Sequence, residues 1–165
     1  SEDLGIPADY FESTVQRFER SFTNKDSLIF LANEVYITTE EYLKENERYT
    51  TAALIIMGGW VEAIHIAINV AIESEDANII ERLIEQKYSL NNLLLMLNEH
   101  KDNEVVAEYI HRLNGVKEKF NDIDVAFDVD FDPDSKAGKQ LVDKAIVQIR
   151  DLQTTVSTFR KELVN

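Results

Sequence analysis

Two Glu-x-x-His pairs are the groups in this chain best suited to metal chemistry. The pairs are Glu62 with His65 and Glu108 with His111. Because residues three apart lie on one face of a helix, each pair would present a carboxylate beside an imidazole. Di-iron carboxylate bundles combine two such pairs with one further Glu from each of two other helices. Glu34 and Glu85 are the candidates for those two places.

The directions of these side chains argue against a shared metal site. Glu108 and His111 fall on one stripe of their expected helix, opposite its apolar face. A pair that faces water cannot join ligands in a core. Glu34 and Glu85 lie beside the apolar faces of their own helices rather than within them. We therefore expect no metal and no other cofactor, and keep a ferritin-like di-metal carboxylate protein as the alternative.

A second constellation lies on the apolar segment 47–73. One stripe at spacings of three and four combines small, polar and charged residues: Thr51, Ile55, Gly58, Glu62, His65 and Asn69. An ionised Glu62 cannot be buried unpaired, so it needs a partner, solvent or a proton. Each glycine of Gly58-Gly59 costs about 1 kcal/mol relative to Ala in a helix, which indicates close approach of another backbone or a bend.

Two interpretations of this stripe stay open. It is either a satisfied polar stripe in close helix packing or the lining of a cleft for a ligand or partner. The residues of the predicted cleft are Gly58, Gly59, Trp60, Glu62, His65 and Asn69.

Other chemistry has little support in the sequence. The alternating carboxylates of 128–134 are similar to those of a calcium loop, but Pro133 and Lys139 stand where such a loop needs Gly and Glu. A solvated edge is the favoured interpretation of this segment, with a weak cation site as the alternative. There is no nucleophile elbow and no glycine-rich phosphate loop. We expect no catalytic residues.

Composition narrows the class of partner. The 165 residues include 31 acidic and 17 basic side chains, a formal net charge of -14. Such a chain repels the phosphate backbone, so nucleic acid is excluded as an expected partner. The absence of cysteine excludes disulfides and thiolate chemistry and leaves the compartment open.

The elements that position these residues are predicted helices, because apolar residues recur at spacings of three and four. The expected helices cover about 8–22, 25–46, 47–73, 76–98, 102–120 and a last stretch after the 132–135 cap. From Ile123 to Phe131 the period changes to two, which predicts an acidic extended connector. We predict an all-α antiparallel bundle of five or six helices in a single domain, 1–165, with the third and last helices central. Since 51–72 contains Glu62, His65 and Asn69, we expect a helix buried in protein and no transmembrane segment.

The segment 51–63, which contains Gly58-Gly59-Trp60-Val61-Glu62, follows the Asp26-Ser27-Leu28 helix start. Together with the Leu4-Gly5-Ile6 opening and the acidic connector, it resembles helical-bundle proteins of bacterial cell envelopes, often lipoproteins. The resemblance implies an exported, periplasmic or membrane-anchored location. It also implies a longer precursor, of which this chain would be the C-terminal part. Similar proteins tend to have an aromatic residue near the place of His65.

These observations predict a non-enzymatic binding or scaffold module of the bacterial envelope. Its expected partner is an unidentified protein or small ligand. A homo-oligomer is the alternative, because a second copy of the chain can cover an apolar helix face.

Overall fold

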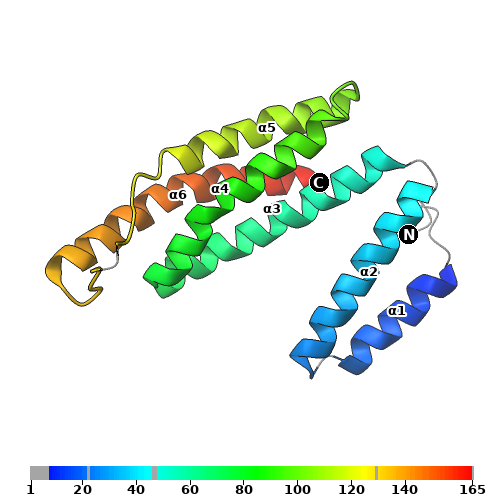
Figure 1. Ribbon diagram of the computed structural model, residues 1–165, viewed down its shortest axis with the longest axis horizontal. Coiled ribbons are helices and arrows are strands. Elements are labelled where there is room, and N and C mark those ends of the chain that lie inside the picture. Colours follow the sequence, from blue (N-terminus) through cyan, green and yellow to red (C-terminus); the bar gives the residue numbers. More distant parts are fainter. Residues whose placement is uncertain (1–7, 22, 46–47, 129, 165) are drawn as a thin grey trace. The chain divides into compact units, whose positions relative to one another are not determined.

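The protein is all-α, as predicted, in a computed structural model that describes residues 8–21, 23–45, 48–128 and 130–164. Six helices follow one another along the chain (Figure 1). The structure divides into two compact units, residues 1–52 and 53–165, and the single domain stays a prediction. The predicted helix boundaries at Phe22, Asn46 and Glu47 lie outside the described residues.

The first unit is a helical hairpin. It contains α1 (Ala8–Ser21) and α2 (Lys25–Glu45). Asn24 caps α2, because its carboxamide oxygen accepts the backbone N–H of Ser27 at 3.0 Å. Leu31 and Leu43 are buried in this unit, whereas Val15 of α1 is exposed.

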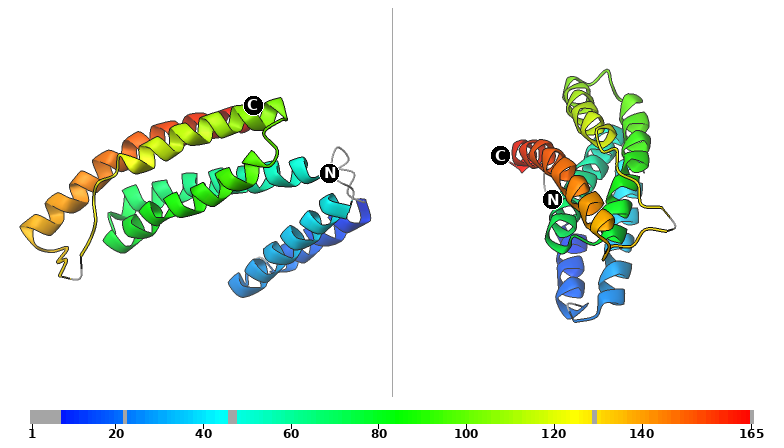
Figure 2. Two further views of the ribbon diagram at one scale, coloured as in Figure 1. Left: turned by 45° about the horizontal axis from the view of Figure 1, so that its top comes forward. Right: turned by 90° about the vertical axis from the view of Figure 1, so that its left-hand side faces the viewer.

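The second unit is a four-helix arrangement built on α3, α4, α5 and α6. Their bounds are Tyr49–Ser74, Ala77–Asn98, Glu104–Asn121 and Lys136–Val164. Successive helices run antiparallel, and the two views of Figure 2 show them packed lengthwise on one another. Asp76 caps α4 as predicted, accepting the N–H groups of Asn78 and Ile79 at 2.8 and 3.2 Å. Helix α5 begins two residues after the expected 102, and its cap is Asn103, whose side chain accepts the N–H groups of Val105 and Val106.

One apolar core joins the four helices of the second unit. The faces predicted from three-four spacing are the buried ones, and the largest fully buried side chains come from every helix: Met57, Ile68, Ile80, Leu83, Leu90, Leu97, Leu113, Phe120, Ile149 and Leu152. Ile123 and Val125 of the connector complete this core. The spacing of apolar residues along each helix therefore determines which of its side chains enter the shared core.

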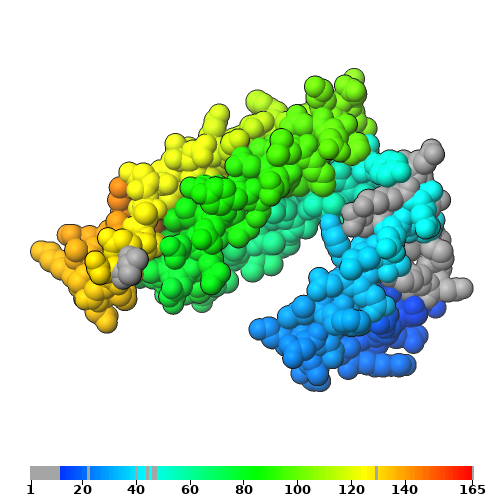
Figure 3. Space-filling view, viewed as in Figure 1, coloured from blue at the N-terminus to red at the C-terminus, as the bar shows by residue number. Residues whose placement is uncertain are grey.

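The connector from α5 to α6 is extended as predicted. Ile123 and Val125 are buried while Asp124, Ala126 and Asp128 are exposed, which is the two-residue alternation of a segment with one covered face. Figure 3 shows it crossing the surface of this unit. The cap of α6 lies within the predicted 132–135 segment. Pro133 precedes the helix instead of entering its first turn, and the Ser135 hydroxyl accepts the Gly138 N–H at 2.9 Å.

Helix α3 differs from the expected central helix, because the other helices of the second unit leave one of its apolar faces exposed. This face, called here the outer face of α3, consists of Ile55, Gly59, Ala63, Ile66 and Val70, all exposed. It lies opposite the buried residues Met57, Val61, Ile64 and Ile68. The expectation of a central helix was wrong for a physical reason. When a helix is apolar on all sides, its sequence does not indicate which side stays exposed in the fold.

By length and mean hydropathy, 1.7 over its most apolar window, α3 is the one helix among the described residues that would be able to cross a membrane. Core helices of soluble proteins pass the same test. The expectation that it does not cross one stays a prediction.

Neighbouring isoleucines of α3 allow a matched test of this arrangement. Ile68 is 0% exposed and Ile66 is 53% exposed. We expect Ile68→Ala to lower the free energy of unfolding by about 2–5 kcal/mol through the cavity it leaves. Ile66→Ala should stay within about 0.5 kcal/mol of the parent. Urea unfolding, followed by the fluorescence of the single tryptophan, Trp60, reports on the second unit. Equal effects of the two variants would contradict the orientation of α3, in which Ile68 faces the core and Ile66 faces outward.

Two glycines should respond to alanine with opposite signs. A Cβ at Gly138 would lie 1.9 Å from the carbonyl oxygen of Asp132, whereas one at Gly115 meets none of the described atoms within 4 Å. We expect Gly138→Ala to destabilise by about 1–3 kcal/mol through overpacking. Gly115→Ala should stabilise by up to about 1 kcal/mol, because it restores helix propensity. Thermal unfolding of both variants checks this, and a neutral Gly138→Ala would contradict the tight turn before α6.

Candidate functional site

The polar stripe of α3 faces α6. Three of the residues predicted to line a cleft, Glu62, His65 and Asn69, each meet a side chain of α6. Their partners are Arg160, Ser157 and Gln153, in reverse order because the two helices run antiparallel. We call these six residues the α3–α6 seam.

The hydrogen bonds of the seam determine which side chain donates and which accepts at each contact. The Gln153 amide donates to the carboxamide oxygen of Asn69 at 2.8 Å, which orients the Asn69 amide nitrogen toward His65. That nitrogen lies 3.3 Å from His65 Nε2, and the Ser157 hydroxyl lies 3.5 Å from His65 Nδ1. In this arrangement Nε2 accepts a hydrogen bond, so the ring proton belongs on Nδ1, facing Ser157. The imidazole is thereby occupied on both sides.

An ion pair closes the seam at Glu62. The Arg160 guanidinium donates to both carboxylate oxygens of Glu62, with Nη2 lying 3.1 Å from Oε1. This hydrogen bonding is the main cause that lowers the pKa of Glu62; desolvation opposes the lowering and the charge of Arg160 adds to it. The same pairing raises the pKa of Arg160. The side chains remain 45% and 34% exposed, so water screens the pair and its contribution to stability is modest.

Of the other three predicted cleft residues, Gly58 lies on the same stripe one turn before Glu62, and the other two lie away from the seam. Gly59 belongs to the outer face of α3, and Trp60 packs against the core on another side of the helix. The Trp60 indole nitrogen is buried without a hydrogen-bond partner among the described residues. No described atom lies within 4 Å of a Cβ built at Gly58 or Gly59, so the close backbone approach that we inferred from the two glycines is absent from the described structure.

The alternative metal set is not brought together. The described residues contain no group of three or more carboxylate or imidazole side chains placed to hold a metal ion. Glu34 belongs to the first unit, where Arg17 binds both of its carboxylate oxygens at 2.7 Å. Glu108 accepts a hydrogen bond from Arg112 at 2.7 Å.

The remaining positions of that set also face the surface. His111 and Glu85 are exposed, as their places on the helical wheel predicted. Among the described carboxylates of the acidic segment, Asp132 accepts the N–H of Asp134 at 3.0 Å and so shapes the turn before α6. Val129, in the middle of this segment, lies outside the described residues.

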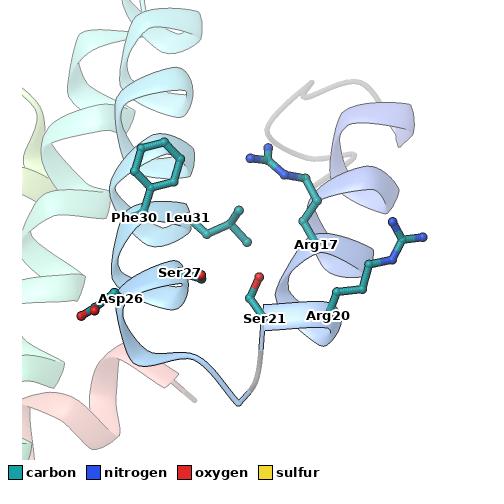
Figure 4. Close-up of a pocket in the computed structure, with 7 residues that line it drawn as sticks. All are labelled: Arg17, Arg20, Ser21, Asp26, Ser27, Phe30 and Leu31. Carbon is teal, nitrogen blue, oxygen red and sulfur yellow. The ribbon is translucent and has the colours of Figure 1, made fainter.

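A surface hollow in the first unit is lined by residues of α1 and α2 (Figure 4). Leu31 points into it from α2, and Arg17, which reaches in from α1, is held by Glu34. The Arg20 side chain extends away from α2. With its inward cation already neutralised, this hollow assembles no group for catalysis.

Sequence reasoning missed the α6 half of the seam. A signal was present: Gln153, Ser157 and Arg160 repeat in reverse the spacing of the α3 stripe. It was not recognised because pairing two stripes requires knowing that α3 and α6 are neighbours. The outer face of α3 was missed for the related reason that its residues match the apolar character of the whole helix.

The Glu62–Arg160 pair predicts a specific dependence of stability on pH. Because the folded-state pKa of Glu62 is lowered from the ordinary 4.5, its contribution is complete above that value. It disappears as the pH falls through the lowered folded-state pKa. We therefore expect Glu62→Gln to be less stable than the parent at neutral pH and the difference to shrink below 4.5. Unfolding midpoints across pH check this, with Glu81→Gln on the exposed side of α4 as the control; a constant difference would contradict the pairing.

Comparison of the chain with protein-family models, with curated proteins and with solved structures finds no match in any of the three. The resemblance to envelope bundles is therefore still a prediction. The geometry described above is what any assignment of function to this chain has to start from.

Proposed function

We propose that this chain is a non-enzymatic protein-binding module whose working surface is the outer face of α3. The bound group is an apolar helix of a partner protein, laid along this face. We favour a partner helix over a small ligand bound in a cleft, because the polar side chains of the seam are already hydrogen-bonded to one another. The single observation that carries the proposal is the apolar face of α3 that the other helices of the second unit leave exposed.

The outer face is contiguous and uncharged. Ile55, Ile66 and Val70 are 36%, 53% and 43% exposed, with Gly59 and Ala63 between them. Isolated exposed apolar residues are ordinary, but a contiguous apolar patch marks an interaction surface. In a chain with a net charge of -14, a face without charge also stands apart from the rest of the surface. Burial of each bulky side chain would contribute about 1–2 kcal/mol to binding.

Gly59 adds an independent argument. A glycine inside a helix costs about 1 kcal/mol relative to alanine, yet no described neighbour lies where its side chain would be. A partner helix packed here would use the missing Cβ, because small residues let two helix backbones approach closely. The glycine is then costly for folding and useful for binding.

The proposed location is the bacterial cell envelope. This part of the proposal is supported by the resemblance of the 51–63 segment and the acidic connector. Fractionation of the cells that make the protein tests it directly.

Photocrosslinking tests the proposed surface. A photoreactive residue in place of Ile66 should give a crosslinked adduct in the cells that make the protein. The same residue in place of Leu95, which is 69% exposed on α4, should give none. Ala63→Glu should abolish the Ile66 adduct, because it sets a charge at the centre of the face without disturbing the core. Absence of any adduct at Ile66, or equal adducts at both positions, would show the proposal to be wrong.

A further inference from the structure

We infer that the α3–α6 seam is a pH-sensitive relay, in which a proton gained by His65 reverses the side-chain amides of Asn69 and Gln153. This inference goes beyond the proposed function and does not depend on it. It follows from which atoms of the seam donate hydrogen bonds, which atoms accept them and which atom is left over. All of these atoms belong to the second unit.

With His65 neutral, its ring and the two amides form one continuous row of donors and acceptors. The Gln153 amide nitrogen donates to Asn69 Oδ1 at 2.8 Å, and Asn69 Nδ2 lies 3.3 Å from His65 Nε2. Both ends of the Asn69 amide are therefore in use, one toward α6 and one toward the ring. Because an amide has its donor and its acceptor on one planar group, a change of role on one side of Asn69 changes its role on the other.

A proton on Nε2 of His65 cannot coexist with this arrangement. Both ring nitrogens of a charged histidine are donors, so Nε2 would face the Asn69 amide nitrogen as donor against donor. Reversal of the Asn69 amide removes the conflict, because Oδ1 then accepts from Nε2. The Asn69 nitrogen then faces the Gln153 nitrogen, and the second amide has to reverse as well. Ser157, 3.5 Å from Nδ1, accepts from the ring in both states.

The second reversal costs the seam no hydrogen bond. Gln153 is half-buried, and its carbonyl oxygen Oε1 has no hydrogen-bond partner among the described residues. After the reversal, Oε1 accepts from Asn69 and the Gln153 nitrogen is left over instead. The relay therefore ends in an acceptor when His65 is neutral and in a donor when His65 is charged.

Few charged groups face the ring of His65. On α3 the group is the Glu62 carboxylate, which is close enough for the two charges to interact. On α6 it is Arg160, whose guanidinium binds Glu62, while the next residue, Lys161, is exposed. Among the described residues, no titratable side chain of α4 or α5 has a polar or charged interaction with the ring. The hydrogen bonds of the ring are therefore the route by which a proton on His65 affects the seam.

NMR spectroscopy of the isotope-labelled full chain tests the relay between about pH 5 and 8, the range in which histidine side chains change charge. We expect the side-chain amide signals of Asn69 and Gln153 to move with the same midpoint as the ring nitrogens of His65. Amide signals that stay constant over this range would overturn the inference. In His65→Gln the movement should be absent; its persistence would show that another group causes it, and the relay would be wrong.

Asn69→Ala separates the relay from an effect of charge through space. The variant removes the middle amide and keeps both His65 and Gln153. We expect the ring still to titrate while the Gln153 signal no longer follows it. Asn114→Ala on α5, whose exposed amide donates only to the Ile110 carbonyl, is the matched control and should leave the coupling unchanged. A Gln153 signal that follows the ring equally well without Asn69 would overturn the relay.

Gln153→Glu tests the relay from its other end. A carboxylate only accepts, so it holds the Asn69 nitrogen toward α6 and the Asn69 oxygen toward His65. The titration midpoint of His65 should then rise by at least about one pH unit, a tenfold gain in affinity for the proton. Thr154→Glu adds the same charge at the exposed neighbouring position and should move the midpoint much less. Equal shifts in the two variants would mean that charge alone acts on the ring, and would overturn the inference.

Discussion

The pairing of polar side chains between α3 and α6 determines how α3 is rotated about its axis, and much of the second unit follows from that rotation. Glu62, His65 and Asn69 lie on an otherwise apolar helix and need partners, because an unpaired polar group loses its hydration on burial. Arg160, Ser157 and Gln153 lie at matching heights on α6. Once these pairs form, Ile68 turns into the core and Ile66 turns outward.

This arrangement separates two tasks on one helix. The inner face of α3 contributes to a core shared by four helices, while its outer face contributes nothing to that core. The seam and the core together disfavour a rotation that turns the outer face inward, because it would separate Glu62 from Arg160 and expose buried residues such as Ile68. The outer face of α3, an exposed apolar surface that lowers solubility, is thereby held in a defined orientation, as a binding surface must be.

Much of the fold was predictable because it depends on local patterns. The three-four spacing of α4, α5 and α6 identified their buried faces, and the change to a two-residue period at Ile123 identified the extended connector. The errors are of two kinds. The start of α5 depends on which of several adjacent polar side chains reaches its first turn, and Asn103 is the one that does. The uncovered face of α3 depends on how many helices surround it, which no local pattern encodes.

The amino-acid sequence by itself determined the helical class, the helix order, the inner faces and the outward direction of Glu108 and His111, because these follow from periodicity along one chain. The tertiary structure alone decided which stripes meet. It joined the α3 stripe to α6, left Gly59 without a neighbour among the described residues, and kept the two Glu-x-x-His pairs from forming one site. The physical reason is that partners such as Glu62 and Arg160, 98 residues apart in sequence, are chosen by packing in three dimensions and not by spacing along the chain.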